Sequence, residues 1–306
     1  MARAKQPKQI HQMTIPEWEA AFPDENACCA YLVGHRWPDG VACPRCGNVK
    51  VFPVSTRPWN WQCYACDPKG ESHRFSHIVG TIFENTNKPL REWFRVIHLM
   101  LTSKKGISAL QIHRMMGFGS YRTAWYMCHR IRAGLANEDF RKLMGIVEVD
   151  ETFVGGKAKN RQWDKRGGGG GTGCVGSGKV PVVGAVSRKG NVVARVIGSV
   201  DATTLKGFVR GAVSEKVSLL CTDQWVGYRG LDTEYPHGHQ PRQGSVRRRR
   251  DPYQHDRRLL VDLQARCGRN VPQGSAKYLP LYVAEFQFRY NNRENDDIFG
   301  EAIRGC

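Results

Sequence analysis

Two apolar segments that each lead into an aspartate constrain this chain more than any other feature. The segment 145–153 contains Asp150 in Val-Glu-Val-Asp-Glu-Thr-Phe, and the segment 217–221 is followed two residues later by Asp223. Their length and their content of branched aliphatic residues predict buried strands. An aspartate after a strand commonly caps a turn, but two of them on neighbouring strands can bind a hard divalent cation.

The segments between these aspartates indicate how the two strands are arranged. Residues 181–188 and 191–197 are predicted as strands joined by a hairpin, and 203–213 has the apolar spacing of a helix. The order of three strands, a helix and a fourth strand fits a mixed sheet of the ribonuclease H type, in which the first and fourth strands are neighbours. That arrangement brings Asp150 and Asp223 together as catalytic carboxylates for Mg²⁺ or Mn²⁺.

The charge of the chain points to an acidic partner. Its 306 residues include 46 lysines and arginines against 28 acidic residues, a net charge of +18, which favours nucleic-acid phosphates. A membrane surface is the alternative, but no stretch approaches the ~18 apolar residues of a spanning helix, and the N-terminus lacks a secretory signal. We therefore expect a cytoplasmic protein, off the membrane, whose 11 cysteines bind metal or remain thiols.

Two Cys-x-x-Cys pairs on either side of a short aromatic segment predict a structural zinc site. Four thiolates at this spacing can complete a tetrahedral zinc shell, and paired redox thiols are the alternative. The predicted ligands are Cys43, Cys46, Cys63 and Cys66. Cys28 and Cys29 are adjacent on a predicted helix, so their side chains diverge and we expect both in the core. Since four sulfurs fill the shell, His73 and His77 are not expected to bind zinc.

The middle of the chain has the outline of a helix-turn-helix. A helix is predicted from Pro89 to Leu101, Ser108 and Ser120 can cap two further helices, and a glycine turn at 117–119 separates them. On the second of these helices we expect an exposed basic face that contacts DNA: Arg122, His129, Arg130 and Arg132. An ordinary helical hairpin with a solvated basic face is the alternative.

The glycine-rich segment 166–180 imitates a phosphate-binding P-loop. Its residues 173–179 match the glycine and lysine spacing, but Val180 replaces the required serine or threonine, and a predicted strand follows instead of a helix. The segment is therefore interpreted as a flexible basic loop near the DNA rather than as a nucleotide site.

In combination, these motifs resemble bacterial insertion-sequence transposases of the DDE class, in the branch with an N-terminal zinc ribbon. The resemblance rests on the cysteine pairs and on five segments: Phe22-Pro-Asp-Glu25, Arg36-Trp-Pro-Asp-Gly40, Val149-Asp-Glu-Thr152 with Gly155-Gly156-Lys157, Thr222-Asp-Gln-Trp-Val-Gly-Tyr228, and Glu285-Phe-Gln-Phe-Arg-Tyr-Asn-Asn-Arg293. It implies cleavage of double-stranded DNA at element ends and joining to target DNA, by a homo-oligomer on DNA. Asp150 and Asp223 would be two of three metal-binding acids, and Lys157 a DNA contact.

The segment 239–275 departs from the family pattern. The family has His-x-Asn-x-x-Glu there, whose Glu is the third acid, whereas this tract holds nine arginines and no lysine. A disordered basic arm is one interpretation. The other is a pair of compensating frameshifts, near 238 and 275, because plausible codons for 251–273 read one nucleotide later encode Ile-His-Thr-Asn-Thr-Ile-Glu-Gly-Phe-Trp-Ser-Ile-Phe-Lys. The Glu then falls at Arg257 and Arg258.

The predicted layout has four parts: an N-terminal helical segment (1–40), a zinc ribbon (41–80), a helix-turn-helix-like segment (81–140) and a ribonuclease H-like domain (141–306), with 239–275 out of frame. The sequence predicts a transposase lineage whose present copy lacks its third acid and is impaired. The alternatives are a non-catalytic DNA-binding remnant or regulator of the same ancestry, and a zinc-ribbon transcription factor without nuclease ancestry.

Overall fold

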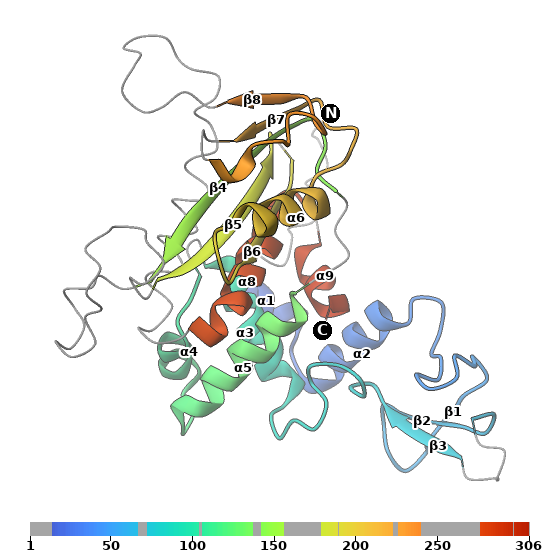
Figure 1. The fold of residues 1–306 in the computed structure, drawn as a ribbon. Helices are drawn as coiled ribbons and strands as arrows, with labels where there is room; N and C mark the ends of the chain where they lie inside the picture. The colour runs from blue at the N-terminus through green and yellow to red at the C-terminus, as the bar shows by residue number, and fades with distance from the viewer. Residues whose placement is uncertain are drawn as a thin grey trace, which may run out of the picture. The chain divides into compact units, whose positions relative to one another are not determined.

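A computed structural model gives the fold of the chain (Figure 1). It describes residues 14–66, 72–103, 106–136, 142–155, 179–188, 190–222, 226–239, 276–295 and 297–305. The chain divides into two compact units, Met1–Leu135 with Glu294–Cys306 and Ala136–Arg293. None of the helices in the described part of the chain is both long and apolar enough to cross a lipid bilayer.

The first unit is mainly helical and is built around aromatic side chains. Its helices are α1 (Ile15–Ala21), α2 (Glu25–Arg36), α3 (Leu90–Thr102), α4 (Ala109–Met116), α5 (Tyr121–Gly134) and α9 (Ile298–Gly305). Phe22, Phe94 and Phe299 are buried, and their ring centroids lie 5.2–5.9 Å apart. The last helix of the chain, which the sequence analysis did not predict, thus completes the core of the N-terminal unit.

The predicted helix-turn-helix outline is present in this unit as two capped helices. The Oγ of Ser108 accepts a hydrogen bond from Gln111 N, and the Oγ of Ser120 accepts one from Arg122 N, each at 3.2 Å. Gly117 ends α4 with φ of 64°, a left-handed conformation that glycine adopts without a steric penalty. The turn and both caps therefore form where the sequence predicted them.

A small antiparallel sheet holds the cysteine pairs. Its order is β1-β2-β3, from β1 (Phe52–Pro53), β2 (Asn60–Cys63) and β3 (His73–Ser76). Its apolar core is slight: among the described residues, the buried members of its cluster are Cys43, Cys63 and Phe75, and the other members are partly buried. A module with so little buried apolar surface needs another source of stability, such as a bound metal.

The second unit contains a five-stranded mixed sheet of order β6-β5-β4-β7-β8. The strands are β4 (Ile146–Val154), β5 (Val180–Ser187), β6 (Val192–Val196), β7 (Leu219–Thr222) and β8 (His237–His239). β4 runs antiparallel to β5 and parallel to β7, and β7 runs parallel to β8. The predicted ribonuclease H-like sheet is thus confirmed, with the first and fourth strands as neighbours; the short edge strand β8 was not predicted.

Two helices cover the two faces of this sheet. Along β5, Val183 and Ala185 pack in the cluster that includes α6 (Ala202–Ala212), whereas Val182 and Val186 pack with α8 (Leu279–Asn291). Each strand buries alternate residues on opposite sides, so both faces are apolar, as expected for a sheet between helices. Asp150 pairs with Gly184, which lies on the same face of β5 as Val182 and Val186, so Asp150 lies on the α8 face of β4.

Helix α8 also covers the backbone of the edge strand β6. Asn291 accepts a hydrogen bond from Val192 N at 2.7 Å and donates one to Val192 O at 2.9 Å, and Gln287 accepts one from Ala194 N at 2.9 Å. Side-chain amides thus satisfy backbone groups that would otherwise be an open sheet edge. This gives a structural reason for the glutamine and asparagine in the segment 285–293.

Candidate functional site

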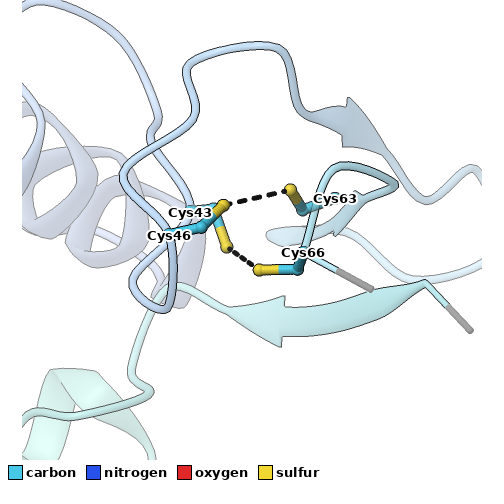
Figure 2. A group of neighbouring side chains, drawn as sticks. All are labelled: Cys43, Cys46, Cys63 and Cys66. Carbon is cyan, nitrogen blue, oxygen red and sulfur yellow. Dashed lines mark hydrogen bonds between the residues drawn. The ribbon is translucent and has the colours of Figure 1, made fainter. Parts of the chain in front are cut away.

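The four predicted zinc ligands converge in the first unit (Figure 2). The sulfur atoms of Cys43, Cys46, Cys63 and Cys66 all lie within 4.8 Å of one another. Two of the separations are 3.4 Å, from Cys43 to Cys66, and 3.7 Å, from Cys46 to Cys63. Because Zn–S bonds are about 2.3 Å, tetrahedral coordination requires sulfurs about 3.8 Å apart. The cluster therefore fits one zinc ion with four thiolate ligands.

The surroundings of Cys43 favour a thiolate. Burial raises the pKa of this thiol, but hydrogen bonds from the backbone N–H groups of Cys46 and Arg45 oppose it, and the pKa falls to about 6. Burial raises the pKa of Cys63, and that of Cys66 to about 12. The protein groups around the cluster thus stabilise one thiolate without a metal, and a cation is needed for all four sulfurs to be thiolates.

The neighbouring histidines and cysteines lie outside this four-sulfur group. His73 Nδ1 is 3.6 Å from the Cys43 sulfur, so the histidine contacts a ligand instead of completing the cluster. His77 Nε2 lies 3.3 Å from the Cys29 sulfur. Cys28 and Cys29 are buried, and burial raises their pKa to about 12 and about 11. These two thiols are core residues, as the sequence predicted.

Asp150 is the one predicted catalytic carboxylate among the described residues. It lies half-buried in the middle of β4, and its Oδ1 accepts a hydrogen bond from Glu151 N at 2.9 Å. Directly opposite on β5 is Gly184, which in turn pairs with Ala194 of β6. Both residues are small, and Gly184 is buried. Asp223 lies outside the described residues.

Glu148 shares a sheet face with Asp150 but is already engaged. Its Oε1 accepts a hydrogen bond from Nε of Arg188 at 2.9 Å and lies 2.9 Å from Nη2 of the same guanidinium, and the carboxylate is buried. A buried carboxylate held by a guanidinium is a structural pair, and removing either partner would leave a buried charge uncompensated. Glu148 is therefore not a candidate metal ligand, although its spacing from Asp150 would allow it.

A contact that the sequence analysis missed joins the two aspartate-containing segments. The hydroxyl of Tyr228, in the 3-10 helix η4 (Val226–Tyr228), donates a hydrogen bond to the carboxylate of Glu151. Tyr228 is buried in the core on the α6 face. Since Glu151 follows Asp150 and Tyr228 comes five residues after Asp223, this bond fixes the segment after β7 to β4. The sequence signal for this contact was the alternation of side chains along β4, which places Glu151 on the sheet face opposite to that of Asp150.

Two of the basic residues predicted to face DNA are buried instead. His129 and Arg132 are 7% and 2% exposed. The expectation that the helix exposes both was wrong, and Arg132 is not available to phosphates. Arg122 is exposed and Arg130 is half-buried. They lie about one helical turn before and after Tyr126. Lys157 lies outside the described residues.

Buried His129 makes the first unit sensitive to acid. Burial, and then the nearby charge of Arg132, lower its pKa to about 4. The unfolded chain therefore binds a proton below pH ~6.5 that the folded chain binds only below pH ~4, so stability is complete above pH ~6.5 and falls toward pH ~4. Between pH 6.5 and 5 we expect a loss of about 2 kcal/mol.

Urea unfolding of the full chain, followed by tryptophan fluorescence at pH 7 and pH 5, checks this expectation. The variant His129→Phe keeps a ring against Trp125, whose ring centroid is 4.3 Å from that of His129, but cannot titrate. Its stability should change less with pH than that of the wild type. An equal loss in both proteins would place the acid sensitivity elsewhere.

Comparisons with known proteins agree with this arrangement. The family model described as an ISXO2-like transposase domain matches residues 142–291, and the transposase zinc-ribbon domain matches residues 23–68. A protein described as an uncharacterized protein in transposable element ISH50, from Halobacterium salinarum, is 28% identical over 152 residues. That match covers 47% of each chain, so the chain spans about half the length of this curated relative.

One solved structure is also similar at a low level. It is a chain of the simian T-cell lymphotropic virus intasome in complex with PP2A regulatory subunit B56 gamma, with 13% identity over 57% of this chain and 64% of that chain. The TM-score is 0.28, below the value at which two chains share a fold.

Proposed function

Because the chain belongs to the insertion-sequence transposases of the IS1595 type, which carry an N-terminal zinc ribbon, we propose that it descends from an enzyme that cuts the ends of its element and joins them to target DNA. The observation that carries this proposal is the strand order β6-β5-β4-β7-β8 with Asp150 on the central strand. The DNA would be double-stranded, and the protein would act on it in the cytoplasm as a homo-oligomer.

The register of β4 and β7 supports Asp150 and Asp223 as a pair. Glu148 lies opposite Cys221 in the parallel pairing, and each aspartate comes two residues later in its own segment. Parallel strands advance together, so residues at equal distances from a paired position are expected to be neighbours. We propose that these two carboxylates bind the catalytic divalent cations.

The carboxylates of Asp150 and Asp223 suit Mg²⁺ or Mn²⁺, which prefer oxygen ligands. When bound, such ions supply Lewis-acid stabilisation of the oxygens that attack and leave the phosphorus. Asp150 itself is oriented by the Glu151 N–H and stands on a rigid strand.

We propose further that this copy is catalytically impaired. A third acid is required for two ions, and the segment 239–275, where the family has it, contains arginines at 257 and 258 instead. Positive charge at that position opposes cation binding. The tract 240–275 lies outside the described residues, so the compensated frameshift remains a hypothesis from the sequence. A non-catalytic DNA-binding remnant is the second candidate, favoured by the same missing acid.

Both candidates require binding to duplex DNA through phosphates, which a titration can test. We propose Arg122 and Arg130 of α5 and Lys157 as contacts, supported by the exposure of Arg122 and the net charge of +18. Affinity for an element-end duplex should fall steeply between 50 and 200 mM salt, and Arg122→Ala should reduce the slope of log K against log salt by about 1.

Arg210→Ala is the matched control for this titration. Arg210 is also an exposed arginine, but its guanidinium donates to the Glu234 carboxylate at 2.9 and 2.6 Å. Its loss changes the net charge equally and should leave the slope unchanged. Binding of wild-type protein that does not weaken with salt would contradict phosphate recognition and, with it, the proposed function.

A further inference from the structure

The first unit contains a cleft beside the proposed DNA contacts Arg122 and Arg130. It lies between α5 and the loop that leads into α3, and its volume is about 530 Å³, within the range of about 300–1,000 Å³ for small-ligand pockets. The lining residues used below are aromatic, cationic or amide-bearing: Asn85, Lys88, Trp93, Arg122, Trp125, Tyr126 and Arg130. No acidic residue is among the described residues that line it.

Aromatic rings provide flat surfaces in this cleft. Trp93 is 1% exposed, and its Nε1 donates to Thr86 Oγ1 at 2.9 Å, so its polar edge is satisfied. Tyr126 is 54% exposed on α5, and Trp125 is half-buried beside it. An exposed tyrosine ring next to a tryptophan suits a planar ligand that stacks.

In the described part of the chain, no carboxylate pairs with the Arg130 guanidinium that lies against these rings. Arg130 Nη2 donates to Glu84 O at 3.0 Å, and Cζ lies 5.4 Å from the centroid of the Tyr126 ring and 5.9 Å from that of Trp93. Lys88, by contrast, is 3.2 Å from the carboxylate of Glu92. The uncompensated positive charge of the cleft therefore rests on Arg130 and exposed Arg122, which suits an anion.

A ligand that combines a planar ring with a phosphate satisfies both features, and we propose that the cleft binds one unpaired nucleotide of DNA. The base stacks on the ring of Tyr126 or Trp125, its edge faces the amide of Asn85, and its phosphate pairs with Arg122 and Arg130. Aromatic rings beside basic side chains are the usual means of binding unstacked bases. An acidic peptide would use the charge but not the rings.

This inference rests on the proposed function, because cutting the ends of an element exposes unpaired nucleotides. It deepens that function by assigning to the first unit a preference for duplex that carries an unpaired base. A fully paired duplex keeps its bases stacked and gains only the phosphate contacts, so the preference is the property that the cleft adds.

Fluorescence anisotropy with the full chain tests the preference directly. The probes are two labelled duplexes of equal length, one fully paired and one with a single unpaired thymidine. The wild type should bind the second more tightly, and Tyr126→Ala should reduce the ratio of the two affinities about 5- to 100-fold, the contribution of one stacked base. Tyr126 is largely exposed, so the variant should fold.

Tyr121→Ala is the matched control. Tyr121 is a second exposed tyrosine of α5, 43% exposed, and it does not line the cleft. Its variant should keep the wild-type ratio. Equal binding of both probes by the wild type, or an equal loss for both in Tyr126→Ala, would overturn the inference while leaving duplex binding intact. Displacement of the unpaired probe by polyglutamate as effectively as by oligothymidylate would overturn it too. Failure to bind either probe would instead contradict the proposed function.

Discussion

Restoring the proposed reading frame between positions 239 and 275 is expected to raise magnesium-dependent cleavage of element ends above that of the chain as written. Restoring the Glu at the position of Arg257 and Arg258 supplies the third carboxylate and removes two positive charges. Since metal ions contribute several kcal/mol to such reactions, the gain should be ~10³-fold or more. Cleavage of a labelled element-end duplex with and without Mg²⁺ measures it.

Two comparisons make this result specific. Asp150→Asn in the repaired chain should abolish cleavage, because an amide lacks the charge that holds the cation, and the nearly isosteric side chain should leave β4 intact. Robust cleavage by the unrepaired protein that is lost in Asp150→Ala would show that a different residue is the third acid. Asp251 and Asp256 are the nearest alternatives in the sequence.

Loss of one zinc ligand is expected to unfold the ribbon. Cys63→Ser removes the sulfur 3.7 Å from that of Cys46, and the module's buried cluster of Cys43, Cys63 and Phe75 is too small to replace the metal. Structural zinc contributes about 10–16 kcal/mol in comparable peptides, so the sheet β1-β2-β3 should lose its order. Elemental analysis should find one zinc per wild-type chain and much less in the variant.

Cys28→Ala controls for the loss of a thiol in the same unit. Cys28 is buried but is not one of the four clustered sulfurs, so this variant should retain its zinc. Proteolysis at residues 41–80 should accelerate in Cys63→Ser and remain slow in Cys28→Ala. Equally low zinc in the wild type and in Cys63→Ser would contradict the metal assignment.

The sequence predicted local structure well where a pattern is local. The caps at Ser108 and Ser120 and the left-handed Gly117 form within a few residues of their partners. The strands of the sheet were recognisable because each carries consecutive branched residues with a turn after it. The order of strands and helix fitted a ribonuclease H-like sheet, which is why the first and fourth strands could be expected as neighbours.

The errors arose where contacts between residues far apart in the sequence determine which side chains are buried. On α5, Arg122, Tyr126 and Arg130 share one face through their spacing of four residues, but His129 and Arg132 are buried. A count of basic residues along the helix could not distinguish the two faces. Helix α9 was missed for a similar reason, since the aromatic partners of Phe299 lie more than 200 residues earlier in the sequence.

The return of the chain to its first unit has a consequence for how such a gene can decay. Phe299 is fully buried among Phe22, Tyr31 and Phe94, and the carboxylate of Asp297 lies 3.1 Å from His35 Nε2. A single uncorrected frameshift near 238 would replace Asp297 and Phe299 and remove their contacts with the N-terminal part of the chain. A second shift that restores the frame by 276 would keep these contacts, and with them the fold of the first unit, even where the third catalytic acid is lost.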